Sequence, residues 1–222
     1  MDEKIKTHIE TLLNRYPMLG VCEQQISQAY DILETAFAQK RKLLVSGNGG
    51  SASDSEHIVG ELMKEFKLKR KVYADQAETM KKIHPELGAI LAENLQGALP
   101  AISLTGHSSL TTAFMNDSEP ELIFAQQVNG YGKEGDVYLG ISTSGNSRNV
   151  LFAAVTAKAK GLKVIGLTGQ RESKLSALAD VCIQVPETET YKIQELHLPV
   201  YHCLCLMLED HFFGNEGKRS EG

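Results

Sequence analysis

Hydrophobic positions along the chain follow two different patterns, and these alternate. Residues 3–16 and 23–39 carry apolar side chains at helical spacing. Further helical stretches are expected at 51–66, 147–160 and 191–213. Between the helical stretches lie short runs that are apolar throughout, as in strands buried on both faces: 42–46, 101–104, 137–141, 163–168 and 181–185. Alternating strands and helices predict an α/β fold with a parallel sheet between two helical layers.

The connection between the first two predicted strands has its own pattern. Residues 67–98 show helical spacing that is interrupted at Pro85, so we expect two short inserted helices. No repeat or linker divides the chain, which predicts a single domain over 1–222. In that domain we expect N-terminal helices at 1–40, an αβα core at 41–213 and a short tail at 214–222.

Composition narrows the class of protein. The chain has 222 residues, of which 42% are hydrophobic and 23% charged, as in ordinary soluble proteins. A net charge of −5 gives no reason to expect a nucleic-acid partner, and we interpret the basic run at 64–71 as a solvated helix end. No apolar stretch is long enough to span a membrane, and the N-terminus lacks a signal-peptide core. Four cysteines without a C-x-x-C pair are typical of reduced thiols, so we expect a cytoplasmic location.

Two predicted strands end in similar small-residue loops, VSGNGGS at 45–51 and STSGNS at 142–147. In parallel sheets ligands bind at the carboxyl ends of strands, and the start of a helix stabilises anions. Four hydroxyl side chains in the second loop suit a phosphate monoester: Ser142, Thr143, Ser144 and Ser147. Helix capping is the alternative, but capping by Ser147 explains one hydroxyl rather than four. For the loop at 45–51, phosphate binding and capping are equally supported, and its glycine spacing matches no nucleotide-binding motif.

Candidate chemistry lies on two predicted helices. His57 and Glu61 are four residues apart and share one helix face. Gln194 and His202 are eight apart on the last helix, a rise of about 12 Å. These groups fit either a divalent-metal site or general acid–base chemistry. The structural alternatives are a surface ion pair for His57 and Glu61, and a hydrogen-bonded core histidine for His202.

The order of these pieces resembles the sugar isomerase (SIS) domain family and, within it, the bacterial phosphoheptose isomerases. The matching stretches are GNGGSASDSEHIVGEL (47–62), MND (115–117), EGDVYLGISTSGNSRNV (134–150), GLKVIGLTG (161–169) and IQELHLPVYH (193–202). The resemblance implies a three-layer αβα sandwich around a five-stranded parallel sheet. It also implies a homotetramer that isomerises a phosphorylated sugar in carbohydrate metabolism.

The resemblance assigns roles to residues. It implies substrate contacts by Asn48, Gly49, Gly50, Ser51, Glu61, Asn116, Asp117 and Gln194, besides phosphate binding by the four hydroxyls of 142–147. It implies a zinc site made by His57, Glu61, Gln194 and His202. Glu61 and His202 match an acid–base pair that moves a proton between C1 and C2 of the open sugar through an enediol. Glu61 could be either a firmly bound metal ligand or a free base, and the sequence does not choose between them. The rise of about 12 Å between Gln194 and His202 also leaves two alternatives, side chains that both bend inward or a site shared between subunits.

Three departures from the family pattern leave the identity of the sugar substrate undecided. Glu65 stands where the family commonly has arginine, Tyr191 stands where an acidic residue is common, and the segment 67–98 is longer than usual. We expect conversion of sedoheptulose 7-phosphate to D-glycero-D-manno-heptose 7-phosphate, with another sugar phosphate as a variant. The non-catalytic alternative is a tetrameric adaptor that binds the replication initiator. A sugar-phosphate sensor ranks last, because no basic DNA-binding region precedes the domain.

Overall fold

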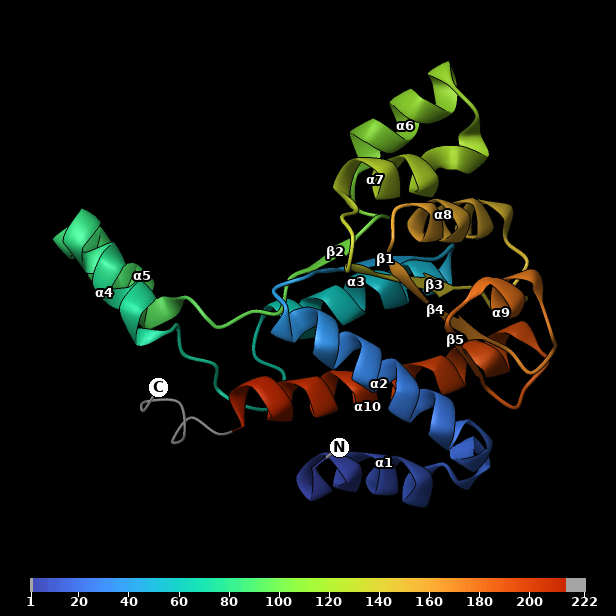
Figure 1. Ribbon diagram of the computed structural model, residues 1–222, viewed down its shortest axis with the longest axis horizontal. Helices are drawn as coiled ribbons and strands as arrows, with labels where there is room; N and C mark the ends of the chain where they lie inside the picture. The colour runs from blue at the N-terminus through green and yellow to red at the C-terminus, as the bar shows by residue number, and fades with distance from the viewer. Residues whose placement is uncertain (1, 215–222) are drawn as a thin grey trace.

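Five parallel strands form the central sheet of the computed structural model, which describes residues 2–214 (Figure 1). They run in the order β2-β1-β3-β4-β5, with every neighbouring pair parallel. All five strands predicted from the sequence are confirmed, and each differs from its predicted range by one residue or less at either end. Their bounds are β1 Leu43–Ser46, β2 Ala101–Ser103, β3 Val137–Ile141, β4 Lys163–Thr168 and β5 Val181–Gln184.

Side chains of the sheet alternate between two cores. Leu43 and Val45 of β1 pack with one helical layer, while Leu44 between them packs with the other. The first layer holds α2 (Glu23–Ala38), α3 (Gly50–Met63) and α10 (Thr190–Phe213), with α1 (Glu3–Arg15) and the 3-10 helix η1 (Pro17–Cys22) outside it. The second holds α7 (Ile123–Tyr131), α8 (Arg148–Ala159) and α9 (Lys174–Leu178). The predicted three-layer α/β architecture is therefore confirmed.

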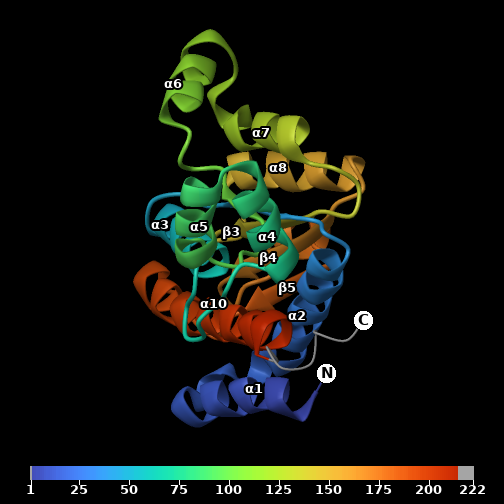
Figure 2. The ribbon, with the colours of Figure 1, turned by 90° about the vertical axis from the view of Figure 1, so that its left-hand side faces the viewer.

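The connection from α3 to β2 forms a helical hairpin that projects from the body of the molecule (Figures 1 and 2). Its helices are α4 (Ala74–Ile83) and α5 (Pro85–Asn94), so the two short helices predicted for 67–98 are confirmed. Pro85 begins α5, where a missing backbone N–H costs least. The helices meet at Gly88, where an added Cβ would lie 2.2 Å from the carbonyl oxygen of Met80.

Three expectations need correction or addition. The helix predicted to reach Phe66 ends at Met63. The basic run at 64–71 is not a solvated helix end, because it lies beyond the helix and its Arg70 is buried. The predicted helical stretches also did not include α7, α9, α6 (Ser108–Asp117), which has no buried residue, or the 3-10 helix η2 (Pro120–Leu122).

The remaining expectations concern the ends of the chain and its cysteines. Cys22, Cys203 and Cys205 are buried free thiols, and Cys182 is a partly buried one. Within the described residues no helix has the length and apolar character needed to cross a bilayer. The tail expected at 214–222 lies outside the described residues except for Gly214, and the single-domain organisation stays a prediction.

Candidate active site

The two small-residue loops lie side by side where β1 and β3 end. These strands are neighbours in the sheet, and the helices that follow them, α3 and α8, pack on opposite faces. This is the switch point at which open α/β sheets bind ligands. The Asn48 side chain of the first loop and the Asn149 side chain in the first turn of α8 make two reciprocal amide hydrogen bonds of 3.0 and 2.8 Å. The sheet topology thus brings residues 47–51 and 142–147 together.

The hydroxyl groups of the second loop are not used as helix caps. Ser147 stands at the N-cap position of α8, but its side chain makes no capping hydrogen bond. Its Oγ lies 3.0 Å from Oγ of the buried Ser142 instead. Gly145 turns the loop with φ +63°, and an added Cβ would lie 2.1 Å from Oγ of Ser173. The loop therefore gathers hydroxyls beside an uncapped helix start, an arrangement suited to an anion.

A cavity of about 190 Å³ adjoins this loop. Thr143, Ser144 and Asn146 line one part of it, and residues that follow β4 and β5 line the rest, including Arg171 and Glu187. Backbone hydrogen bonds tie these loops together, from Gly169 N to Thr143 O and from Gln170 N to Glu187 O. The cavity thus offers space and both signs of charge next to the hydroxyl loop.

His57, Glu61 and His202 form a second cluster between α3 and α10. Nε2 of His57 lies 3.1 Å from Oε1 of Glu61, and the rings of His57 and His202 pack edge to face with centroids 4.9 Å apart. Oε2 of Glu61 and Nε2 of His202 are buried without a hydrogen-bond partner, although Nζ of Lys64 lies 3.9 Å from Oε2 of Glu61. Burial lowers the pKa of His202, as does nearby His57, while Glu61 raises it. A carboxylate and an imidazole thus lie in one cluster, each with a buried polar atom that has no hydrogen-bond partner.

Sequence reasoning missed two polar residues of this cluster, Asp54 and Tyr201. The hydroxyl of Tyr201 lies 3.0 Å from Nδ1 of His57 and donates to Oδ1 of Asp54 at 3.1 Å. Burial raises the pKa of Asp54, against the opposing effects of Tyr201 and His57. Asp54 lies three residues before His57 on the same helix face, a signal that was present in the sequence.

A buried ion pair holds the end of α3 against α10. Nε of Arg70 donates to Oε1 of Glu209 at 2.8 Å, and its other nitrogens donate to the carbonyl oxygens of Glu61 and Leu62. Glu209 also accepts the backbone N–H groups of residues 66–68. Phe66 in turn packs against the ring of His202, with centroids 5.3 Å apart. The pair therefore fixes the segment that surrounds both Glu61 and His202.

Gln194 is not brought to this cluster. Its amide lies at the start of α3, where a Cβ added to Gly50 would be 2.7 Å from Nε2 of Gln194. From Gly50, His57 and Glu61 lie about 10 and 16 Å further along the helix axis. In residues 2–214 no three His, Cys, Asp or Glu side chains are arranged to hold a metal ion as they stand. The structure thus groups three of the four predicted metal ligands and places the fourth beside the small-residue loops.

Comparison with known proteins identifies the family. The SIS domain model matches residues 77–169. A phosphoheptose isomerase from Aneurinibacillus thermoaerophilus is 34% identical over 97% of this chain and 98% of its own. One from Rhodospirillum rubrum is 36% identical over 95% of this chain and 98% of its own. This chain belongs to the phosphoheptose isomerase family of SIS-domain proteins.

Solved structures of the phosphoheptose isomerase family agree with that assignment. The chain superimposes on a phosphoheptose isomerase from Francisella tularensis with TM-score 0.73 and 30% identity, covering 94% of this chain and 97% of that one. For the Neisseria gonorrhoeae phosphoheptose isomerase the TM-score is 0.70 at 29% identity, over 94% and 98% of the two chains. The resemblance inferred from the sequence is confirmed, and the chain is an isomerase related to phosphoheptose isomerases.

Two residues matched to the family's substrate contacts stand apart from both clusters in this chain. Asn116 and Asp117 are exposed at the end of α6 and hydrogen-bond to each other at 2.8 Å. Helix α6 packs on η2 and α7, in the layer opposite α3 and α10. Their role in binding substrate stays a prediction.

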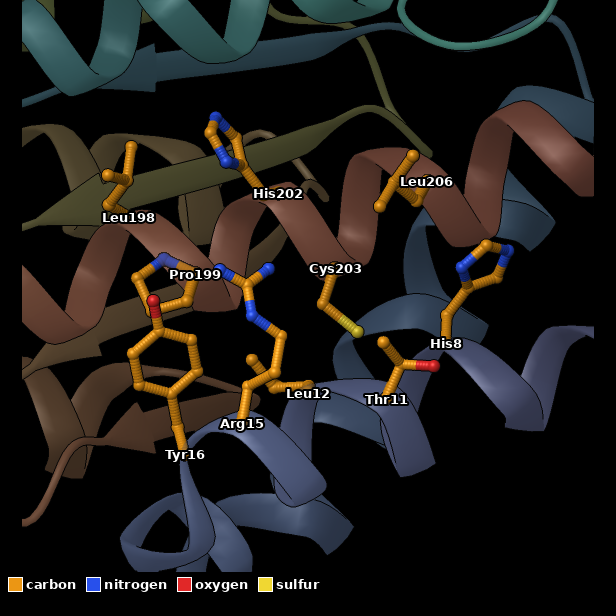
Figure 3. Close-up of a pocket in the computed structure, with 10 residues that line it drawn as sticks. All are labelled: His8, Thr11, Leu12, Arg15, Tyr16, Leu198, Pro199, His202, Cys203 and Leu206. Carbon is orange, nitrogen blue, oxygen red and sulfur yellow. The ribbon is translucent and has the colours of Figure 1, made fainter.

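His202 also borders a cavity of about 170 Å³ between α1 and α10 (Figure 3). In this view Arg15, the last residue of α1, and Tyr16, which follows it, rise toward Pro199, while His202 and Cys203 leave α10 in opposite directions. The cavity walls are largely apolar side chains of α1 and α10, among them Leu12, Leu198 and Leu206. This cavity therefore lies behind the cluster, on the side of α10 that faces α1.

Proposed function

We propose that this chain interconverts a ketose phosphate and an aldose phosphate. Sedoheptulose 7-phosphate and D-glycero-D-manno-heptose 7-phosphate are the leading pair, because the relatives that cover nearly the whole chain are named phosphoheptose isomerases. One observation carries the chemistry: Glu61 and His202 lie in one cluster, and each has a buried polar atom without a partner. Buried polar groups are normally paired, so such atoms are suited to bind a ligand.

In the proposed reaction the protein supplies binding and proton transfer. The loop at 142–147 holds the phosphate through its hydroxyls and the start of α8. Glu61 takes the proton from one carbon of the opened sugar and returns it to the neighbouring carbon through an enediol. His202 exchanges a proton with the substrate oxygens. The lowered pKa of His202 favours its neutral imidazole, which can accept as well as donate.

The cluster has donor atoms that suit zinc, the metal implied by the family resemblance. Two ligands of a tetrahedral zinc lie about 3.3 Å apart, and Nε2 of His57 lies 3.1 Å from Oε1 of Glu61. The unpartnered Nε2 of His202 is a third donor nearby. His57, Glu61 and His202 would hold the ion, which when bound polarises a carbonyl oxygen. For Gln194, its position beside Gly50 supports contact with substrate more than contact with metal.

A homotetramer with shared sites also belongs to the proposal. The small-residue loops meet the start of α3, whereas Glu61 lies about 16 Å further along its axis. If the loop at 142–147 of one copy faced Glu61 and His202 of another copy, the phosphate site and the acid–base pair would lie closer together than they do within one chain.

Incubation with ketose phosphates tests the function. The purified protein is given pentulose, hexulose and heptulose phosphates, with and without a chelator, and the aldose is detected by NMR. We expect the heptose product to form fastest, with a loss of rate under chelation. Failure with every substrate would refute the isomerase and favour the adaptor, whereas turnover of a shorter sugar alone would keep the reaction and change the substrate.

A further inference from the structure

A line of hydrogen bonds runs from Asp54 through Tyr201 to His57. Asp54 and His57 lie on α3, and Tyr201 reaches them from α10, where its side chain is buried. The Tyr201 hydroxyl donates to Oδ1 of Asp54 at 3.1 Å and lies 3.0 Å from Nδ1 of His57. The line ends at Glu61, whose Oε1 lies 3.1 Å from Nε2 of His57.

Counting protons fixes the direction of these bonds. A tyrosine hydroxyl has one proton, and here it is used in the hydrogen bond that Tyr201 donates to the carboxylate of Asp54. The Tyr201 oxygen therefore accepts a hydrogen bond from Nδ1 of His57, so a ring with a single proton carries it on Nδ1. Nε2 is then left with a lone pair that faces the carboxylate of Glu61. Two acceptor atoms at this distance repel each other unless a proton or a metal cation lies between them.

We propose that Tyr201 and Asp54 are positioning residues that hold His57 with its Nε2 lone pair toward Glu61, so that the two side chains bind a divalent metal ion. An imidazole nitrogen beside a carboxylate oxygen suits a cation of intermediate softness such as zinc. Partners that fix the tautomer of a histidine ligand are a common requirement of metal sites. The inference rests on the metal site of the proposed function and adds the two side chains that orient it.

Metal affinity provides the first test. The full chain is freed of metal, and Zn²⁺ is titrated in competition with a chelating dye. We expect Tyr201→Phe to bind Zn²⁺ about 10- to 100-fold more weakly than the native chain. Asp54→Ala should also weaken binding, because the Tyr201 hydroxyl is then free to donate its hydrogen bond to Nδ1, which favours the His57 tautomer with its proton on Nε2.

The chain offers a matched control at Tyr30. Its hydroxyl lies 3.0 Å from Nδ1 of His211, and Nε2 of His211 lies 3.3 Å from Oε1 of Glu34. Tyr30→Phe therefore removes a tyrosine–histidine bond of the same length outside the proposed site. We expect its Zn²⁺ affinity to equal that of the native chain.

The tautomer itself provides the second test, and it needs no activity. In ¹⁵N-labelled metal-free protein we expect His57 to carry its proton on Nδ1, and Tyr201→Phe to mix the two forms. A native His57 protonated on Nε2 alone would overturn the inference, as would native Zn²⁺ affinity in Tyr201→Phe or no Zn²⁺ binding by the native chain. Isomerase activity is measured separately, so the inference can fail while the proposed function stands.

Discussion

Nε of Arg70 lies 2.8 Å from Oε1 of Glu209, and both side chains are almost completely buried. The pair joins the segment after α3 to α10, the two helices that carry His57, Glu61 and His202. All three nitrogens of the guanidinium donate hydrogen bonds, and three backbone N–H groups also reach the carboxylate. A buried pair satisfied in this way is costly to break, because one partner alone leaves the other charged and buried.

Arg70→Met should therefore destabilise the protein strongly. We expect a loss of about 3–5 kcal/mol in the free energy of unfolding, measured by urea denaturation. The exposed pair of Lys82 and Glu78, 2.7 Å apart, is the control, and Lys82→Met should cost less than about 1 kcal/mol. Equal losses for the two variants would show that the Arg70 pair does not hold the helices together.

Ser147→Ala separates the two interpretations of the hydroxyl loop. A capping role predicts a loss of about 1 kcal/mol in the free energy of unfolding. Since Ser147 makes no capping bond, we expect almost no change in unfolding by urea, together with a higher KM for phosphorylated substrate. Loss of stability with an unchanged KM would restore the capping interpretation.

The strands could be predicted from the sequence because each is a short run that is apolar on both faces. In β1, for example, Leu43 and Leu44 enter opposite cores. The end of α3 could not be predicted, because the segment that follows it is held by Glu209. This side chain lies far along the sequence and accepts hydrogen bonds from the backbone of residues 66–68. Helix α6 was not predicted because none of its residues is buried, so its sequence has no apolar stripe.

The candidate site was predictable where spacing on one helix carries the information. His57 and Glu61 share a face and do pair, and the loops after β1 and β3 do meet. Tyr201 could not be singled out, since it stands among the apolar residues of α10 and only the packing of α3 brings Asp54 to its hydroxyl. The burial of Arg70 could not be predicted for a similar reason, because the sequence of a basic run does not show which of its charged side chains is buried.

Protein stability should fall on acidification because of His197. Its side chain is buried, which lowers the pKa to about 4 from the usual 6.5, against a weaker opposing effect of the Thr168 carbonyl. Between these values the unfolded chain binds a proton that the native chain does not, so stability decreases as pH falls from 6.5 toward 4. The pKa difference corresponds to about 3 kcal/mol.

His197→Gln is the variant that checks this pH dependence. It should flatten the dependence of the free energy of unfolding on pH within the same window, as measured by urea denaturation at several pH values. An unchanged slope between pH 6.5 and 4 would assign the acid sensitivity to other groups.

Glu61→Gln should abolish turnover while leaving binding of the sugar phosphate largely intact. The substitution removes the base but keeps the size of a side chain that is mostly buried. Proton transfer by a positioned group contributes about 10²- to 10⁴-fold to rate, so kcat should fall by at least the lower figure. Binding is followed by calorimetry with the substrate, and turnover at the native rate would rule out Glu61 as the base.

Mixing two inactive variants tests whether the site is shared between subunits. One variant carries Glu61→Gln, and the other carries Ser142→Ala with Ser147→Ala, so each lacks one of the two clusters. If an anion loop of one copy serves the acid–base pair of another, hybrids formed by unfolding and refolding the mixture contain some native sites and regain activity. The distance of about 16 Å between Gly50 and Glu61 along α3 favours this result. Light scattering gives the number of subunits in the hybrids. If hybrids that contain both variants stay inactive, the whole site lies within one chain.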